Sequence, residues 1–237
     1  MLLSIKELGE EPPESELWQQ VYERLDEERL KKVTALQNQR KKAESAGGGL
    51  LVQHLLHCVT DGECDSGQKV IAADETCAAF SLVECTLSGL LAELGAPVPV
   101  RYTYGIKGKP YLQNKRNSPE VFFNLSHSGD YVVCAVSEKE VGVDIQKMRA
   151  EGIEKLADRF FSVEERRILQ GRQDLFYRLW TRKEAYGKLT GEGITAAIDK
   201  DFSDLKADWM GNLIWEEFDT PSGYKIACCS KRQENGI

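Results

Sequence analysis

One aspartate of the sequence stands where an apolar residue would be expected. Asp144 lies in the run EVGVDIQ, between Val143 and Ile145, although aspartate is uncommon inside strands. Burying its ionised carboxylate costs free energy unless a nearby group compensates the charge. Because successive strand residues point to opposite faces, Asp144 shares a polar face with Gly142 and Gln146. Two interpretations are open: a functional carboxylate with space beside it, or an aspartate that bonds a nearby backbone amide.

A second group of charges lies on a predicted helix whose first half is apolar. Phe176, Leu179 and Trp180 have the i, i+3, i+4 spacing of a stripe that faces a core. The same stripe then continues through Lys183, Glu184, Gly187 and Lys188. The simpler interpretation is a surface ion pair between Glu184 and Lys188, worth roughly a few tenths of a kcal/mol. Their position on the Trp180 stripe favours charges that line a cleft.

Together the strand and the helix could form a site for a divalent cation. If the stripe packs on the polar face of the strand, Asp144 and Glu184 meet, and two like charges repel unless a cation lies between them. Magnesium takes few protein carboxylates and completes its shell with water and phosphate oxygens. Lys183 and Lys188 would then face the phosphates.

Two loops could supply further contacts to an anionic ligand. In GIKGKPY, Lys107 and Lys109 offer charge before Pro110, although the same sequence is typical of an ordinary turn. In NLSHSGD, His127 follows a strand in a polar loop. Its neighbour Ser126 cannot pair with it as nucleophile and base, so contact with a phosphate fits better than a serine hydrolase.

The composition excludes several classes of protein. The chain has 237 residues, 41% of them hydrophobic and 29% charged, as in an ordinary globular protein. A formal net charge of -7 disfavours nucleic acid and anionic membranes as partners. We find no signal peptide and no stretch apolar enough for a membrane span, and therefore expect a cytoplasmic protein. Seven cysteines in a reducing compartment indicate buried free thiols.

Periodicity and turn signals predict a coarse order of elements. Residues 15–56 are predicted to be helical, and Gly47–Gly49 either breaks this segment or lets another backbone pass closely. Residues 76–95 are predicted to form a helix, and short strands follow over residues 100–146. Helices then return, with Glu165 completing a capping box in SVEERRIL, before a hairpin of NLIWEEF and YKIACCS.

The order of helices followed by strands occurs twice. The segment SEKE at residues 137–140 joins the two parts, and DEERLKK in the first is echoed by VEERRIL in the second. We therefore predict an N-terminal half over residues 1–138 and a C-terminal half over residues 139–237. Such a chain contains its own interface, so we expect a monomer.

Four motifs occur in a fixed order and together resemble one enzyme family. They are GKPY (108–111), FNLSHS (123–128), VGVDI (141–145) and FS-x2-E … W-x2-KEA-x2-K (161–188). This set resembles the 4′-phosphopantetheinyl transferases of the larger Sfp type. The resemblance implies an α+β fold, a pseudo-dimer of two similar α/β halves. Each half would be a small, mostly antiparallel sheet packed with helices, with the active site in the cleft between the halves.

The resemblance also implies an activity. Such an enzyme transfers the 4′-phosphopantetheine group of coenzyme A to a serine of an acyl or peptidyl carrier protein. The reaction requires magnesium and releases adenosine 3′,5′-bisphosphate. The carrier would serve fatty acid, polyketide or nonribosomal peptide biosynthesis.

Roles for single residues follow from the matching motifs. Asp144 and Glu184 resemble the magnesium ligands, and Glu184 is also the candidate base, directly or through water, for the serine hydroxyl. Lys188 would hold the pyrophosphate during catalysis. Further contacts to coenzyme A are implied for Ser126 and His127 at its phosphates, and for Lys109 and Pro110 at its adenine end.

The chain departs from the family pattern in three places. Many relatives have a glutamate two residues after the strand aspartate, whereas Gln146 stands here and could hold a metal through a water with one negative charge fewer. Residues 61–99 form a longer segment than the class leads us to expect. The basic run Arg40–Lys42 could meet a coenzyme A phosphate, but Glu44 stands where a basic residue is usual.

Two other functions stay open from the residues. One is a non-catalytic module that binds coenzyme A or a nucleotide. The other is a magnesium-dependent phosphohydrolase that uses the same carboxylates with water as nucleophile. The joint presence of Asp144, Lys183, Glu184 and Lys188 speaks against the loss of catalysis.

Overall fold

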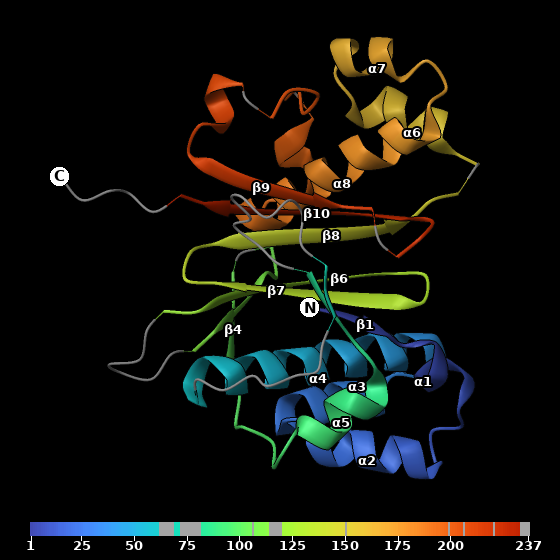
Figure 1. Ribbon diagram of the computed structural model, residues 1–237, viewed down its shortest axis with the longest axis vertical. Coiled ribbons are helices and arrows are strands. Elements are labelled where there is room, and N and C mark those ends of the chain that lie inside the picture. The colour runs from blue at the N-terminus through green and yellow to red at the C-terminus, as the bar shows by residue number, and fades with distance from the viewer. Residues whose placement is uncertain are drawn as a thin grey trace, which may run out of the picture. The chain divides into compact units, whose positions relative to one another are not determined.

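Three small β-sheets packed with helices form the described part of the chain (Figure 1). The structure is a computed structural model that describes residues 1–61, 69–71, 82–105, 107–113, 120–149, 151–198, 200–205, 207–219 and 221–232. The predicted α+β class is therefore confirmed. The pseudo-dimeric build and the cleft between halves stay predictions.

The described residues divide into two compact units. The first takes its residues from 1–72, 81–102 and 125–134, and the second from 103–124 and 135–237. Strands β6 (Phe122–Ser128) and β7 (Tyr131–Ser137) each begin in one unit and end in the other. The predicted halves, 1–138 and 139–237, stay a prediction.

The first unit contains most of a five-stranded sheet in the order β2-β3-β1-β7-β6. Strand β1 (Leu2–Ser4) pairs parallel with β3 (Leu82–Cys85) and antiparallel with β7. Strand β2 (Lys69–Ile71) pairs antiparallel with the other edge of β3. The short β1 strand is thus held on both sides.

Strand β3 corrects the prediction of a single helix over residues 76–95. Leu82–Cys85 is extended because its backbone pairs with β1 and β2, far away in the sequence. Helix α5 (Leu87–Glu93) begins only after Thr86, whose hydroxyl accepts a hydrogen bond from the amide of Gly89 at 3.1 Å. Residues 76–81 lie outside the described residues.

The predicted helical region 15–56 is confirmed and consists of three helices after a short first one. These helices are α1 (Lys6–Glu10), α2 (Glu16–Arg24), α3 (Glu27–Ala35) and α4 (Gln39–Asp61). Ser15 caps α2 through the amide of Trp18, and Asp26 caps α3 through the amide of Arg29. Each of these side-chain caps marks the start of a new helix. The hydrophobic spacing alone does not show these boundaries, because it continues across them.

The triple glycine of α4 allows close packing and does not break the helix. A methyl group on Gly47 would lie 2.6 Å from Cγ2 of Ile5, and one on Gly49 would lie 2.6 Å from Cγ of Arg29. The groups that come close to this run are side chains of neighbouring segments, and not another backbone as expected.

The second unit contains an antiparallel sheet in the order β8-β10-β9. Its strands are β8 (Val141–Lys147), β9 (Leu213–Phe218) and β10 (Tyr224–Lys231). The predicted C-terminal hairpin is confirmed, since β9 and β10 pair antiparallel. A two-stranded sheet of β4 (Tyr102–Tyr104) and β5 (Pro110–Leu112) confirms the strands expected around the GKPY turn.

Three α-helices lie between β8 and β9 in the sequence. They are α6 (Ile153–Phe160), α7 (Val163–Leu169) and α8 (Gln173–Thr190), and the 3-10 turns η1 (Ile194–Ala197) and η2 (Asp208–Met210) follow. The capping box of α7 is confirmed. The amide of Glu165 donates to the hydroxyl of Ser162 at 3.1 Å, and the amide of Ser162 donates to Oε2 of Glu165 at 2.7 Å.

An aromatic core anchors the first half of α8, as the apolar stripe predicts. Phe176 is buried and stacks on Phe161 with ring centroids 5.1 Å apart, and Trp180 stacks on Phe176 at 5.9 Å. Leu179 is completely buried. These contacts hold the first half of the helix against the junction of α6 and α7, just before its stripe becomes charged.

Two glycines let the second half of α8 approach its neighbours at backbone distance. A methyl group on Gly142 of β8 would meet the carbonyl oxygen of Ala185 and would lie 2.6 Å from the amide nitrogen of Leu189. A methyl group on Gly187 would lie 2.8 Å from the amide nitrogen of Ile194. Strand, helix and the following turn therefore touch through their main chains.

Two further expectations concern cysteines and membrane spans. Cys85, Cys134, Cys228 and Cys229 are free and buried, as expected. The expectation of a free thiol is wrong for Cys58, which is disulfide-bonded. Of the helices that the structure describes, none combines the length and the apolar character that a membrane crossing requires.

Replacement of Gly142 by alanine is expected to destabilise the protein. The added methyl group meets helix backbone, which cannot turn aside, so the free energy of unfolding should fall by about 1–3 kcal/mol or more. Urea denaturation measures this change. Gly95→Ala is the control, because nothing lies within 4 Å of the methyl group it would add. Equal effects of the two substitutions would contradict the close contact of α8 with β8.

Candidate active site

The polar face of β8 lies against the second half of α8. Gly142 on this face touches the helix backbone. Further along the strand, Nζ of Lys188 donates to Oδ1 of Asp144 at 2.7 Å and to the carbonyl oxygen of Val143 at 3.1 Å. The charged half of the helix stripe and the aspartate of the strand therefore meet.

Asp144 is buried, and polar side chains contact both of its oxygen atoms. Its relative exposure is 2%, so its charge needs compensation inside the protein. Lys188 supplies a positive charge at Oδ1, and Nε2 of Gln146 donates to Oδ2 at 3.1 Å. These side-chain contacts favour a site carboxylate over an aspartate that only bonds the backbone.

Glu184 is the second carboxyl group of this site. Burial and then the nearby charge of Asp144 raise its pKa to about 7, while Lys188 acts in the opposite direction. Glu184 lies one helical turn before Lys188, which contacts Asp144, so the two residues share a face of the helix. Helix α8 thus directs Glu184 and Lys188, one turn apart, towards the same aspartate.

The oxygen atoms present here fit a hard divalent cation. Asp144 and Glu184 repel each other, and Gln146 offers an amide oxygen beside them. Among the described residues, no group of three or more His, Cys, Asp or Glu side chains is placed to hold a metal. A site with two carboxylates agrees with magnesium, which keeps several water or phosphate oxygens in its shell.

Asn124 is a buried neighbour of this site for which the sequence predicts no role. Its side-chain oxygen accepts a hydrogen bond from the amide of Val143 at 3.1 Å, next to Asp144. This contact holds the start of β8 to strand β6, to which Asn124 belongs. An asparagine between phenylalanine and leucine in a strand-like run is a signal of the same kind as Asp144.

Lys183 does not face a phosphate in this structure, which corrects that expectation. Its side chain is completely buried, and its ammonium lies 2.9 Å from Oε2 of Glu165. It also donates to the carbonyl oxygens of Ala197 at 2.9 Å and Lys200 at 2.8 Å. A lysine ammonium has three N–H groups, and these three acceptors engage all of them.

The GKPY turn lies at the C-terminal end of α8. Nζ of Lys109 donates to the carbonyl oxygen of Leu189 at 2.6 Å, and Nζ of Lys107 donates to that of Glu192 at 3.0 Å. Burial lowers the pKa of Lys109. Two cations therefore meet the carbonyl end of the helix, where the helix dipole favours positive charge. Pro110 begins strand β5 beside them.

Ser126 and His127 belong to the first unit. Ser126 is buried in β6, whereas His127 is exposed and its Nδ1 lies 3.4 Å from Oε2 of Glu44. Glu44 also accepts a hydrogen bond from Nε of Arg40 at 3.2 Å. The departure noted at Glu44 thus places a carboxylate between two candidate phosphate contacts. The binding of coenzyme A by Ser126 and His127 stays a prediction.

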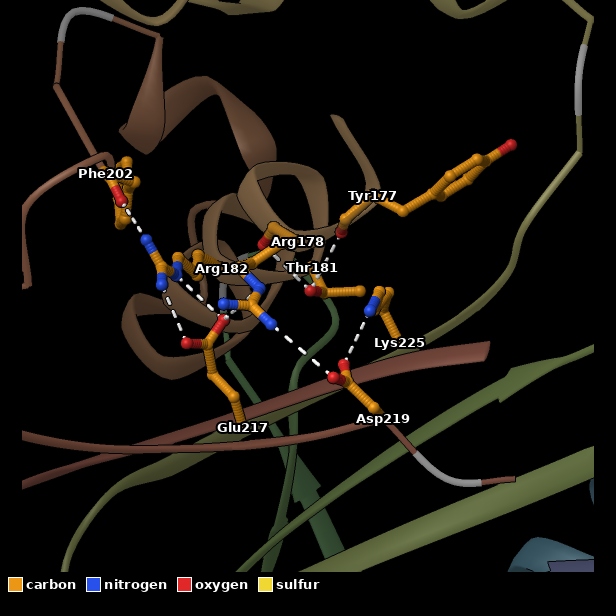
Figure 2. A network of polar contacts seen from close by, with 8 residues as sticks. All are labelled: Tyr177, Arg178, Thr181, Arg182, Phe202, Glu217, Asp219 and Lys225. Carbon is orange, nitrogen blue, oxygen red and sulfur yellow. Dashed lines mark hydrogen bonds and ion pairs between the residues drawn. The ribbon is translucent and has the colours of Figure 1, made fainter. Parts of the chain in front are cut away.

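A second polar network fixes α8 to the sheet on another side of the helix. Figure 2 shows the guanidinium of Arg182 against the carboxylate of Glu217 on β9, with contacts of 2.9 and 2.7 Å. Arg182 also donates to the carbonyl oxygen of Phe202 at 2.6 Å. Arg178 continues the network to Asp219, which Lys225 contacts at 2.6 Å. These contacts limit rotation of the helix that carries Glu184.

Glu184→Gln is expected to stabilise the metal-free protein, and more so at high pH. The folded pKa of about 7 lies above the ordinary 4.5, so stability is full below the ordinary value and is lost as pH rises through about 7. Glutamine removes that loss. Thermal melts between about pH 4 and pH 8 measure the difference, and Glu192→Gln, an exposed carboxyl after the same helix, is the control. A difference independent of pH would contradict the raised pKa of Glu184.

Comparison with known proteins finds a family and several relatives to which this chain is similar. Residues 140–229 match the 4′-phosphopantetheinyl transferase superfamily. A 4′-phosphopantetheinyl transferase of Bacillus subtilis is 34% identical over 148 residues, which are 56% of this chain and 64% of the relative. Sfp of Bacillus subtilis strain 168 is 31% identical over 145 residues, 55% of this chain and 63% of the relative.

A third relative, the 4′-phosphopantetheinyl transferase HetI of Nostoc sp., is 39% identical over 105 residues, 41% of this chain and 44% of the relative. The matched part of the chain thus covers between 44% and 64% of the length of these three relatives. It includes β8 and α8, which carry Asp144, Glu184 and Lys188. Over about half of its length, the chain is thus similar to 4′-phosphopantetheinyl transferases.

Proposed function

We propose that this protein transfers the 4′-phosphopantetheine group of coenzyme A to a serine of an acyl or peptidyl carrier protein. The observation that carries the proposal is the cluster of Asp144, Glu184 and Lys188, formed by β8 and α8 within the family match. Two carboxylates with a lysine beside them suit a pyrophosphate and its counter-ion. The names of the relatives describe the same transfer.

The reaction forms one bond and breaks another at the phosphorus atom that bears pantetheine. The serine oxygen of the carrier attacks this phosphorus, and the bond to the bridging oxygen of the pyrophosphate breaks. Adenosine 3′,5′-bisphosphate leaves with that oxygen, and the serine proton passes to a base. Transfer of this kind depends on positioning and charge neutralisation and little on covalent work by the protein.

Glu184 is the candidate base for the serine proton, directly or through a water molecule. A pKa of about 7 makes its carboxylate a stronger base than an ordinary glutamate, and about half of it is ionised at neutral pH. Lys188, which contacts Asp144, would stabilise the negative charge of the pyrophosphate.

Magnesium is the proposed metal, held by Asp144 and Glu184 and through water by Gln146. When bound, it would neutralise the charge that develops on the pyrophosphate oxygens. The chain contributes the two carboxylates and fixes their direction through β8 and α8. Lys109 and Pro110 at the adenine end, with Ser126 and His127 at the phosphates, complete the proposed contacts to coenzyme A.

Intact-protein mass spectrometry of an apo carrier protein tests the transfer. With coenzyme A and magnesium present, the carrier should gain the mass of one phosphopantetheine group. We expect Glu184→Gln to lower kcat/KM by about 10²–10⁴-fold, since it removes the base and a metal ligand. Glu192→Gln is the matched control and should retain the wild-type rate.

Other outcomes of this experiment would contradict the proposal. Release of adenosine bisphosphate without a mass gain on the carrier would indicate a phosphohydrolase. Binding of coenzyme A with neither product, across carriers of fatty acid, polyketide and nonribosomal peptide assembly, would indicate a binding module.

Gln146→Glu is expected to tighten magnesium binding. One added negative charge a few ångströms from a divalent cation contributes on the order of 1–2 kcal/mol even in a watery environment, or about tenfold in Kd. The same change removes the amide that donates to Asp144, so the variant should be less stable without metal. Calorimetric titration with magnesium measures the affinity, and the exposed Gln113→Glu controls for net charge. Equal affinities of the wild type and Gln146→Glu would exclude a role of Gln146 at the metal.

A further inference from the structure

A buried ion pair is formed by Lys183, the residue directly before Glu184 on α8. Lys183 of α8 and Glu165 of α7 have no solvent exposure, and their charged groups are 2.9 Å apart. The rings of Phe161 and Phe202 lie near the ammonium, with centroids at 5.6 and 4.8 Å. Because these walls exclude water, the pair interacts strongly, and each charge would be costly without the other.

Every polar atom of the pair also has a backbone partner. The ammonium of Lys183 donates to the carbonyl oxygens of Ala197 and Lys200, which belong to the segment that follows α8. Oε1 of Glu165 accepts from the amide of Phe202 at 2.8 Å, and Oε2 accepts from the amide of Ser162 at 2.7 Å. The pair thus joins the start of α7, the middle of α8 and the chain after η1 at a single point.

Such a pair is weak evidence for stability. Replacing both members of a buried pair by uncharged residues often leaves stability unchanged, whereas removing one member is strongly destabilising. The pair instead fixes geometry. The three N–H groups of Lys183 reach their acceptors only when α8 has one particular rotation about its own axis. The role of the pair is therefore found by asking what this rotation positions.

The rotation of α8 positions Glu184. Lys183 and Glu184 are adjacent and lie about 100° apart around the helix axis. Contacts that fix the direction of the Lys183 side chain therefore also fix the side of the helix on which Glu184 lies. Arg182, directly before Lys183 in the sequence, is fixed by Glu217 and the carbonyl oxygen of Phe202 (Figure 2). The helix is therefore held at the residues directly before the carboxylate that approaches Asp144.

We propose that Lys183 and Glu165 are positioning residues of the metal site. They fix the rotation of α8 so that Glu184 shares its space with Asp144, and they touch neither metal nor substrate. The inference deepens the proposed function and rests on it for any effect on transfer. Its effect on magnesium affinity can be measured without coenzyme A or a carrier.

The decisive variant removes both charges, Lys183→Met with Glu165→Gln. The glutamine retains an oxygen for one of the two amides, and the methionine replaces a chain of similar volume. We expect the double variant to melt close to the wild type but to bind magnesium roughly 10–100-fold more weakly, the usual effect of losing a residue that orients a ligand. Its kcat should fall more than its KM for coenzyme A changes.

Single variants and exposed neighbours provide the controls. Lys183→Met alone leaves a buried carboxylate unpaired and should be less stable than the double variant. Lys183→Arg keeps the charge and the fold but displaces the helix, so its magnesium affinity should also fall. Glu164→Gln and Lys155→Met change exposed residues of α7 and α6 and should match the wild type in both measurements.

The outcomes separate this inference from the proposed function. A folded double variant or a folded Lys183→Arg variant with wild-type magnesium affinity would overturn the positioning role. Weaker magnesium binding in these variants, with no transfer by the wild type to any carrier, would leave the positioning role and overturn the transferase. Wild-type protein that binds no magnesium would overturn both.

Discussion

The contact of helix α8 with strand β8 is the constraint on which the site depends. Because residue 142 has no side chain, the carbonyl oxygen of Ala185 and the amide of Leu189 lie directly against the strand. At this separation the lysine at position 188 can reach both Asp144 and the carbonyl oxygen of Val143. A wider separation would leave the aspartate buried without its cation.

Charge is balanced at this contact in two different ways. On the side of the helix that faces Asp144, burial and then the charge of Asp144 raise the pKa of Glu184, and Lys188 opposes this rise only in part. Behind the helix, Lys183 and Glu165 neutralise each other completely and satisfy backbone groups as well. The group of Asp144, Glu184 and Lys188 can therefore take up a further cation, whereas the pair of Lys183 and Glu165 cannot. Six consecutive residues of α8, from 183 to 188, carry both arrangements.

Residues that break a local pattern could be predicted from the sequence. Asp144 in an apolar run and Glu184 on a tryptophan stripe were identifiable because each violates its own periodicity, and the capping box of α7 is a local signal. The burial of Lys183 was not identifiable in this way, because helical spacing indicates a face but does not distinguish a cleft from a buried partner. That partner, Glu165, was correctly assigned to capping, but its second oxygen contacts Phe202, which is 37 residues away.

Pairing between distant segments explains the remaining differences. Leu82–Cys85 has an apolar and helix-compatible sequence, and it is a strand only because β1 begins at the second residue of the chain and lies beside it. The same limit applies to Gly142, whose importance depends on a helix more than 40 residues later. The position of Ser126 and His127 relative to the metal site stays a prediction of the motif alone.

The glycine at position 187 has a consequence for how this helix can vary. A side chain there would enter the turn at Gly193 and Ile194, and Gly193 itself has φ 72° and ψ -175°, a conformation that is largely restricted to glycine. With Gly142, these positions form a region of low mutational tolerance around the second half of α8. Sequence diversity in this region, whether from drift or from a randomised library, is therefore confined to side chains that point away from the strand and the turn.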